Sequence, residues 1–499
     1  MHRAMHVLDG LGLHEPRSFY DHPYDHPYFG QFFLASVFKA ILYPDSLKVS
    51  SAPNDALHSI EMLYLLPRVV MGIFAVADTF LLYKIAERHY NRNIAFIASI
   101  LFAVMPITWM LRKIWLESLL LPLLLLSILF ASYYKKNTKK KNKKNNDNNT
   151  NKRKIAMTLT SGIFLGLGIF TKIPLFTMIP VVSFLIYKNN NRNLKTLALW
   201  FAPVLLIPLV WPAHVIFLGE FELWLKDSIW HTQRNDIDNR LLNSVRYLFQ
   251  IDPVLMVLGI VGVIYAEIKR DFLVLLWTIP FLIFLFFIDY VSFFHLIPLF
   301  PALCIAAAKL IVDLSNKITN IKEKKFEKIL PFIIISGIGI FGLVSTTIII
   351  TTNVTSFYFE VYSFILQDLL NYKDNDNNVN NNDKVTMIGR HWTRSFYWIP
   401  KYVFDKDLDF NEIDTIGRNL GSLITKEKIL FIVDNNIIRA ISTEVPPDER
   451  SRLLQILYYN TVPIIRLESK AVRYDIDNYP YASMTANRDR NWVEIRVNY

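Results

Sequence analysis

The sequence predicts a mainly α-helical, polytopic membrane protein that ends in a smaller α/β domain. Hydrophobic residues make up 52% of the 499 residues and charged residues only 19%, with a mean hydropathy of +0.27. Apolar runs recur along residues 62–352, whereas residues 353–499 have the composition of a soluble domain. This composition excludes a disordered or collagen-like chain. The single cysteine, Cys304, excludes a disulfide-stapled scaffold.

The apolar runs have the length and spacing of transmembrane helices. A helix needs about 20 apolar residues to cross a hydrocarbon core of about 30 Å. Three of the runs are short, and the loops around Lys172 and Tyr290 are minimal. We expect ten spans, at 62–86, 94–111, 114–134, 155–171, 173–187, 196–218, 253–267, 271–289, 291–314 and 329–352.

Basic loops predict the orientation of these spans. Nine Lys and one Arg lie between 134 and 155, so the positive-inside rule places this loop in the cytoplasm. Strict alternation then places four further charged loops inside, at 87–93, 188–195, 267–271 and 315–328. It leaves outside the loops 112–113, 172, 219–252 and 290, together with both chain ends. The net charge of +11 is therefore an orientation signal, and nucleic acid is not an expected partner.

The two outer ends have different expected structures. Residues 1–61 form an outer loop in which 28–43 is an interfacial helix; a short true span there is the alternative, and it would reverse the charged loops. Residues 353–499 are expected to form an extracytoplasmic α/β domain, because 384–391 and 428–436 have strand patterns and 446–460 is amphipathic. Two low-complexity segments are expected to be disordered, the basic loop 135–154 and the Asn/Asp-rich insert 371–383.

Charged residues at the outer ends of the spans are the first candidates for chemistry. Charge is costly in a membrane and therefore marks functional hypotheses. Cations could hold a lipid-linked phosphate while a carboxylate deprotonates an incoming hydroxyl. Snorkelling of Arg112 and Lys113 to headgroups is the alternative. Arg68 and Asp78, inside the first span, are expected to be helix-packing partners. The candidates at the outer face are Arg112, Lys113, Glu117, Lys172 and His295.

A tandem DHPY sequence forms the densest polar cluster. It contains Asp21, His22, Asp25 and His26, residue types that can chelate a metal. Each His precedes a Pro, which favours extended backbone and spreads the side chains apart. We therefore expect no metal site, but a loop that presents Asp25 and His26 to a phosphate or acceptor. The sequence demands no cofactor and leaves a requirement for a divalent cation open.

Several motifs, in order, resemble the GT-C glycosyltransferases. The branch in question contains the dolichyl-phosphate-mannose protein mannosyltransferases and the aminoarabinose transferases of lipid A. The matching segments are RAMHVLDGLG with DHPYFGQFFLASVFKAI, then LPRVVMGIFAVADTFLLYKIAERHYNRNIAFIASILFAVMP, then RKIWLESLLLP, and finally GIFLGLGIFTKIPLF and FFHLIPLFPALCIAAAKLI. The resemblance covers roughly residues 1–315.

The resemblance implies roles for individual residues. Glu117 takes the family's second acidic position, and His26 and Lys172 take phosphate-facing positions. His295 stands where relatives often have Arg or Tyr. The family's first helix and hallmark acid have no counterpart here, so the resemblance implies a truncated chain or a degenerate homologue. Asp25 is a better-placed substitute for that acid than Asp9.

The expected function is transfer of a sugar from a polyprenyl-phosphate (dolichyl-phosphate) donor to a protein, lipid or glycan acceptor on the outer face of the plasma membrane. Glu117 and Asp25 are the expected catalytic carboxylates. The donor phosphate would be bound by His26, Arg112, Lys172 and His295. The alternatives are a transporter or flippase, which requires inverted repeats and charges at mid-membrane, and a non-catalytic membrane scaffold.

Overall fold

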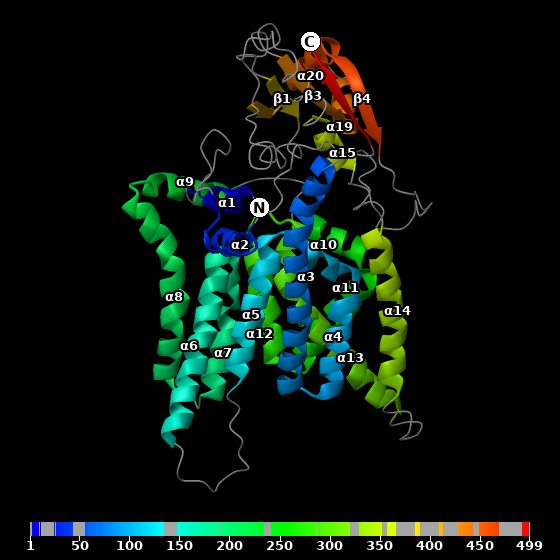
Figure 1. Cartoon of the computed structure of the whole chain (residues 1–499). Helices are drawn as coiled ribbons and strands as arrows, with labels where there is room; N and C mark the ends of the chain where they lie inside the picture. The colour runs from blue at the N-terminus through cyan, green and yellow to red at the C-terminus, as the bar shows by residue number, and fades with distance from the viewer. Residues whose placement is uncertain are drawn as a thin grey trace. The chain divides into compact units, whose positions relative to one another are not determined.

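The fold is seen in a computed structural model (Figure 1). The residues it describes are 2–8, 10, 24, 26–42, 55–133, 147–190, 192–233, 241–288, 290–319, 329–351, 357–365, 385–389, 409–412, 428–442, 449–468 and 492–498. Apart from the first two residues, the chain divides into two compact units. One contains residues 3–35 and 67–348; the other contains 36–66 and 349–499.

Helices occupy all ten predicted spans, and the predicted mainly α fold class is confirmed. Five have the length and composition to cross a membrane, within Tyr64–His89, Lys152–Thr171, Leu194–Phe217, Phe293–Lys317 and Leu330–Ile348. The helices are α3 (Asp55–His89), α4 (Arg92–Val104) with η2 (Pro106–Arg112), α5 (Leu116–Ser132), α6 (Asp147–Thr171), η3 (Ile173–Met178) with α7 (Ile179–Asn189), α8 (Leu194–Phe217), α11 (Pro253–Ile268), α12 (Phe272–Phe286), η5 (Phe293–Leu299) with α13 (Phe300–Thr319), and α14 (Leu330–Thr351).

Two contrasting surfaces explain how the helices pack. Large aliphatic side chains remain exposed on the outer helices, for example Leu206 of α8 and Ile340 of α14, which are 64% and 65% exposed. Exposed aliphatic surfaces of this kind are typical of helices that contact lipid tails. Inside, small residues let backbones approach. A Cβ atom on Gly262 of α11 would lie 2.5 Å from the backbone carbon of Ala306 on α13.

Polar contacts join several helices at one end of the bundle. Asp271, at the start of α12, accepts hydrogen bonds from the Tyr90 hydroxyl (2.8 Å) and from Lys309 of α13 (2.5 Å). His89, the residue before Tyr90, forms a hydrogen bond with the hydroxyl of Ser132 at the end of α5 (2.8 Å). Tyr90 and Asp271 belong to two loops predicted to share the cytoplasmic side, and the structure brings these two residues into contact.

Four further helices belong to the predicted outer segments. They are α1 (His2–Leu8), α2 (Phe29–Ala40), α9 (Phe221–Gln233) and α10 (Leu241–Ile251). Helix α2 occupies the segment predicted as an interfacial helix. Helices α9 and α10 lie in 219–252, for which the sequence analysis predicted only a loop. The apolar spacing of Leu241, Val245 and Leu248 is the missed signal for α10.

The second unit contains a five-stranded sheet in the order β2-β1-β3-β5-β4. The strands are β1 (Val385–Gly389), β2 (Asp409–Glu412), β3 (Lys428–Asp434), β4 (Val462–Glu468) and β5 (Trp492–Val497). β1 pairs in parallel with β2 and β3, whereas β5 is antiparallel to β3 and β4. Helix α15 (Phe357–Phe364) packs on one face through Val361. α19 (Asn435–Ser442) and α20 (Glu449–Tyr459) pack on the other.

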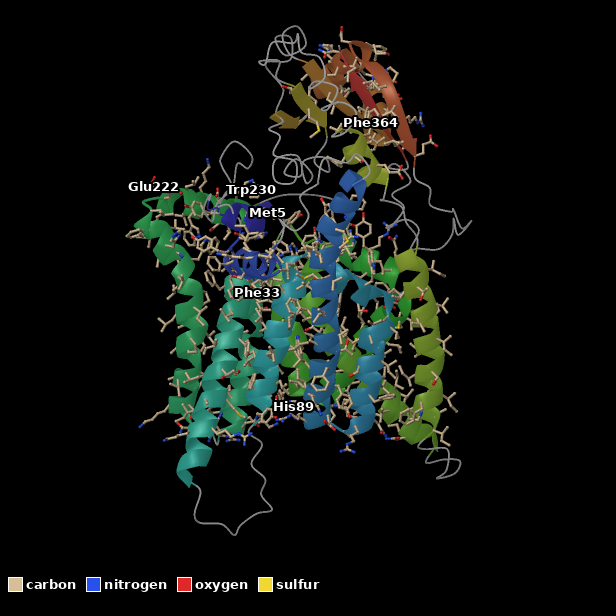
Figure 2. All side chains as sticks on the ribbon, in the orientation of Figure 1. Met5, Phe33, His89, Glu222, Trp230 and Phe364 are labelled. Atoms are coloured by element: carbon tan, nitrogen blue, oxygen red, sulfur yellow. The ribbon has the colours of Figure 1, made fainter. Side chains whose placement is uncertain are left out.

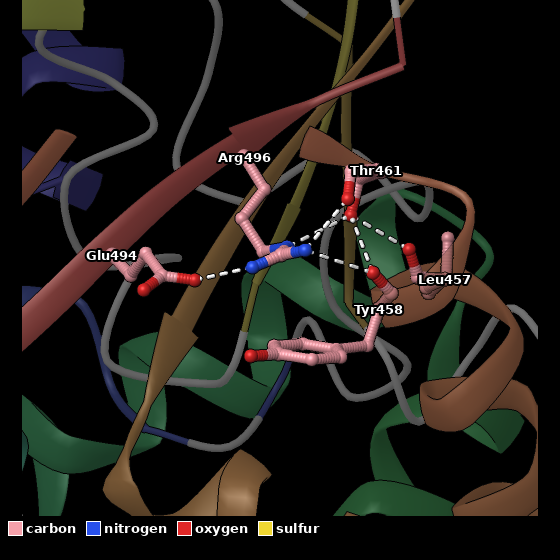
Figure 3. A network of polar contacts seen from close by, with 5 residues as sticks. All are labelled: Leu457, Tyr458, Thr461, Glu494 and Arg496. Carbon is pink, nitrogen blue, oxygen red and sulfur yellow. Dashed lines mark hydrogen bonds and ion pairs between the residues drawn. The ribbon is translucent and has the colours of Figure 1, made fainter. Parts of the chain in front are cut away.

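A buried arginine ties α20 to the sheet (Figure 3). Arg496 of β5 pairs with Glu494 at 2.5 Å and donates to the backbone carbonyls of Tyr458 (3.1 Å) and Thr461 (2.6 Å). Its guanidinium also lies over the Tyr458 ring, 3.9 Å from the centroid. Because each of these partners satisfies part of the guanidinium, a buried charge is tolerated here. The predicted α/β domain is confirmed; β2, β4, β5 and α19 were not predicted.

The close approach of α11 and α13 can be tested by adding one methyl group. Gly262→Ala forces backbone atoms of α13 to move, so we expect a lower thermal unfolding temperature of the detergent-solubilised protein. Gly337→Ala in α14 is the matched control, because its added Cβ meets nothing within 4 Å. That control should be neutral or slightly stabilising, since Ala favours helix by about 1 kcal/mol over Gly. Equal effects of the two changes would contradict the packing described.

Candidate active site

Helix α2 packs against the start of α5, the end of α6 and the middle of α3, and Gly30 makes the approach to α5 and α6 close. A Cβ atom at Gly30 would lie 2.5 Å from Leu116 of α5 and 3.3 Å from Thr171 of α6. Phe33 contacts Phe74 of α3, with ring centroids 5.8 Å apart. Figure 2 shows Phe33 and His89 at opposite ends of the bundle. The candidate site is at the Phe33 end, away from the Tyr90–Asp271 contacts.

A buried ion pair lies beside the residues that Gly30 touches. Glu117, in the first turn of α5, pairs with the ammonium group of Lys172, which joins α6 to η3. Glu117 is 3% exposed and Lys172 is 8% exposed. Lys172 has extended backbone between α6 and η3, and Pro174 in the first turn of η3 prevents α6 from continuing. The sequence predicted both residues at the outer face, and the structure brings them into contact.

Segment η5 adds an aromatic wall and a histidine. The Lys172 ammonium lies 5.2 Å from the Phe294 ring centroid, and Phe294 contacts the ring of His295 at 4.5 Å. The backbone N–H of Ser292 donates to Nδ1 of His295 (3.1 Å), so the neutral imidazole carries its proton on Nε2. His295 and Lys172 thus both lie against the Phe294 ring. The hydrogen bond from the Ser292 backbone leaves Nε2 of His295 as the donor nitrogen.

The Lys113 ammonium lies close to two tryptophan rings, one of which contacts Phe294. This ammonium is 4.3 Å from the Trp109 centroid and 5.0 Å from that of Trp115, and Trp115 contacts Phe294 at 5.2 Å. Burial, and secondarily repulsion from the nearby cation Arg68, lowers the pKa of Lys113 to about 8. Lys113 is therefore a poorly solvated cation at the edge of the site.

Backbone hydrogen bonds hold this lysine in place. The carbonyl of Lys113 accepts hydrogen bonds from the Ser118 hydroxyl (2.8 Å) and from the Trp115 N–H (2.9 Å).

Asp252 joins α11 to η2. Its carboxylate caps α11 by accepting from the N–H of Leu255 (2.9 Å) and also accepts from the N–H of Ile107 in η2 (3.5 Å). Burial raises the pKa of Asp252 to about 7, although both backbone donors oppose that rise.

Two tyrosines of the tandem DHPY loop fix the chain before α2. The Tyr24 hydroxyl donates to Glu220, and its backbone N–H donates to the buried carboxylate of Asp227 on α9 (3.0 Å). The Tyr28 hydroxyl hydrogen-bonds Nδ1 of His214 at the end of α8 (2.8 Å). Burial, followed by the charge of Glu220, raises the pKa of Tyr28. Tyr24 and Tyr28 therefore hold the chain before α2 against α8 and α9.

The structure places the remaining predicted residues unevenly. His26 lies two residues before the clamped Tyr28 and is half-buried. Asp25 lies outside the described residues, as does the side chain of Arg112, whose backbone ends η2. Asp78 is buried and its carboxylate has no hydrogen-bond partner among the described residues, while Arg68 is exposed. Within the same residues, no three His, Cys, Asp or Glu side chains come together as a metal site would require.

Sequence reasoning missed the aromatic part of the site. Trp109 and Trp115 lie close to Lys113, Phe294 lies close to Lys172, and Tyr24 and Tyr28 hold the chain before α2. A signal was present, because these residues lie within a few positions of the charged candidates at the predicted outer ends of spans. It was not decisive, since aromatic residues are common at both membrane interfaces.

The resemblance inferred from the motifs is confirmed for the N-terminal part of the chain. Residues 19–222 match the model of the family described as dolichyl-phosphate-mannose-protein mannosyltransferase. This range contains Glu117, Lys172, Lys113 and the DHPY loop. Among curated proteins, none matches the chain.

Solved structures of membrane transferases are also similar to this chain. The oligosaccharyltransferase of Archaeoglobus fulgidus in the apo form has 13% identity and a TM-score of 0.49, over 97% of this chain and 73% of that one. The same organism's AglB with an inhibitory peptide and a dolichol-phosphate has 12% identity and a TM-score of 0.48, over 95% and 70%. ArnT from Cupriavidus metallidurans bound to undecaprenyl phosphate has 10% identity and a TM-score of 0.49, over 100% and 92%.

The Glu117–Lys172 pair can be tested by a double-mutant cycle. Removing one partner of a buried pair leaves an uncompensated charge, at a cost of about 3–5 kcal/mol. We expect Glu117→Leu and Lys172→Met each to lower the unfolding temperature strongly, and the double variant to be more stable than either single one. Additive losses in unfolding experiments would show that the two side chains do not interact.

Proposed function

We propose that this chain is an integral membrane glycosyltransferase that uses a polyprenyl-phosphate sugar at the Glu117–Lys172 site. The observation that carries the proposal is the buried ion pair between Glu117 and Lys172. Both residues lie next to α2 and inside the range that matches the mannosyltransferase family. A charged pair in this position is costly to bury and therefore marks a functional site. The acceptor is a protein, lipid or glycan hydroxyl.

Lys172 would stabilise the leaving phosphate. Its ammonium group is held by Glu117 on one side and faces the Phe294 ring on another. A donor phosphate that binds the Lys172 ammonium would take over some of the hydrogen bonds that Lys172 donates to Glu117. Because charge builds up on the phosphate as the bond to the anomeric carbon breaks, a fixed cation there stabilises the transition state more than the ground state.

Glu117 would act as the base for the acceptor. Once the phosphate shares Lys172, the Glu117 carboxylate can accept the proton of the incoming hydroxyl. The hydroxyl oxygen forms the new bond to the anomeric carbon as the bond to the phosphate oxygen breaks, with inversion at that carbon. Asp25 is the second proposed carboxylate, and His26, Arg112 and His295 are the further proposed phosphate-binding groups.

The proposed location is the plasma membrane, with the donor site and the α/β domain outside the cytoplasm. An even number of spans places both ends of the chain on one side, and the basic loops place that side outside. The α/β domain would contribute to acceptor binding. Lipid surrounds the bundle, whose helices expose large aliphatic side chains.

The catalytic role of Glu117 predicts a large loss of transfer. Glu117→Gln should lower the rate of mannose transfer from dolichyl-phosphate mannose by about 100-fold or more, since general bases contribute about that much. The rate is measured with the full-length protein in detergent and radiolabelled donor. Glu222→Gln on α9 is the matched control, because that side chain is exposed. If Glu117→Gln transferred mannose at the wild-type rate, Glu117 would not be the base.

The proposed orientation predicts which cysteines a membrane-impermeant maleimide can label. In intact cells, Tyr459→Cys in the α/β domain should react, because Tyr459 is 78% exposed. Lys140→Cys in the basic loop should react only after the membrane is permeabilised. The native Cys304 is buried and should stay unlabelled in both conditions. The reverse pattern of labelling would contradict the orientation.

A further inference from the structure

Helix α9 has a row of large apolar side chains for which the function proposed so far has no use. Phe221, Leu225 and Ile229 follow one another at intervals of four residues, and each is 42–43% exposed. A helix advances by about 100° per residue, so these three side chains lie within about 80° of one another. They therefore form one continuous apolar face, which we call the α9 stripe.

A second face of α9 packs on the protein. The buried carboxylate of Asp227 accepts a hydrogen bond from the backbone N–H of Tyr24 (3.0 Å). The Trp224 ring contacts the ring of Trp211 on α8, with centroids 5.5 Å apart. These contacts fix how α9 is rotated about its own axis, and they leave the α9 stripe exposed.

A third face of α9 is charged and lies beside the stripe. Glu222 and Lys226 are exposed, and each comes one position after a residue of the stripe, Phe221 and Leu225. One position on a helix is a rotation of about 100°, so the charged face adjoins the apolar one. Helices that lie along a bilayer surface have this division, because the apolar face enters the lipid and the charged face stays in water.

A rigid corner sets the direction of α9. Gly219 has a φ of 72°, which glycine adopts without strain. The N–H of Glu220 donates to the carbonyl of Val215 (3.1 Å) and the N–H of Gly219 to that of Ile216 (3.0 Å), a Schellman motif that ends α8. Figure 1 shows that α9 turns away from the direction of α8 at this corner. Helix α9 therefore begins close to the point where α8, a candidate membrane span, ends.

Continuity with α8 identifies a lipid bilayer as the partner of the stripe. The last residues of α8 and its cap, Ile216, Phe217 and Leu218, are exposed, and Phe217 is 87% exposed. Apolar side chains on a membrane-spanning helix contact lipid, and Phe221 continues this surface into α9. Tryptophan is enriched at the boundary between membrane and water. The last two turns of α8 and α9 contain three tryptophans, Trp211, Trp224 and Trp230.

We propose that α9 is an interfacial anchor whose stripe inserts into the lipid leaflet on the side of the Glu117–Lys172 site. The stripe would lie at the boundary between headgroups and acyl chains, while Glu222 and Lys226 face water. Because Asp227 of the same helix holds Tyr24, the anchor also keeps the chain before α2 in place. The inference goes beyond the proposed function and does not depend on sugar transfer.

Fluorescence quenching by lipid tests the insertion. The full-length variants Leu225→Cys and Lys226→Cys, a matched pair of exposed neighbours, are labelled with the fluorophore NBD in phosphatidylcholine nanodiscs. Cys304 is buried and should not react. Phosphatidylcholine with a nitroxide on its acyl chain should quench the label at 225 about twice as strongly as that at 226, because apolar faces insert by about 5–10 Å. Aqueous iodide should show the opposite order.

Two results of this experiment would overturn the proposal. Equal quenching of the two labels by the nitroxide lipid would mean that the stripe does not face the bilayer. A label at 225 that neither the nitroxide lipid nor iodide quenches would mean that protein covers the stripe, either a second copy of this chain or another partner.

A charge placed in the stripe tests whether the anchor holds the DHPY loop. Leu225→Asp should lower nitroxide quenching of a label at Phe221→Cys and should speed hydrogen exchange of the Tyr24 backbone amide in nanodiscs. Lys226→Gln is the matched control and should change neither value. Both positions are exposed, so the unfolding temperature in detergent should stay at that of wild type. Unchanged quenching and exchange in Leu225→Asp would contradict the anchor.

Discussion

The ion pair between Glu117 and Lys172 is the interaction on which the candidate site depends. Both charges are buried where α5 begins and α6 ends, so each requires the other to remain there. The pair links the start of α5 to the end of α6, and α2 can lie over this junction because Gly30 has no side chain. The same contacts therefore stabilise the helix ends and hold an acid and a base together.

Aromatic rings adjoin the Lys172 side of the pair. The Lys172 ammonium lies 5.2 Å from the Phe294 ring centroid, and Trp115 contacts both Phe294 and Lys113. Aromatic walls limit the water around the ammonium groups, so their charges act on a bound anion with less screening. Tyr24 and Tyr28 bond to Glu220, Asp227 and His214, and these contacts fix both tyrosines before α2.

The sequence predicted the helical frame well because a membrane imposes a simple rule on composition. All ten apolar runs contain helices, and Glu117 and Lys172 were expected at the same face. Helix α9 was missed because its many polar residues resemble a loop, and α10 was missed because its apolar spacing extends over only 11 residues. The pairing of Glu117 with Lys172 could not be derived, because 55 residues separate them and periodicity carries no information on distant contacts. The roles of Trp115 and Phe294 were hidden for the same reason.

Direct binding of the donor lipid phosphate tests the central claim, namely that Lys172 and its partner Glu117 form the donor site. The measurement is the affinity of the full-length protein for dolichyl phosphate in neutral-lipid nanodiscs. Lys172→Gln should weaken binding by about tenfold or more, the cost of a lost charge-assisted contact, while Lys195→Gln should bind as wild type does. Equal affinity of Lys172→Gln and wild type, in a folded protein, would contradict the account.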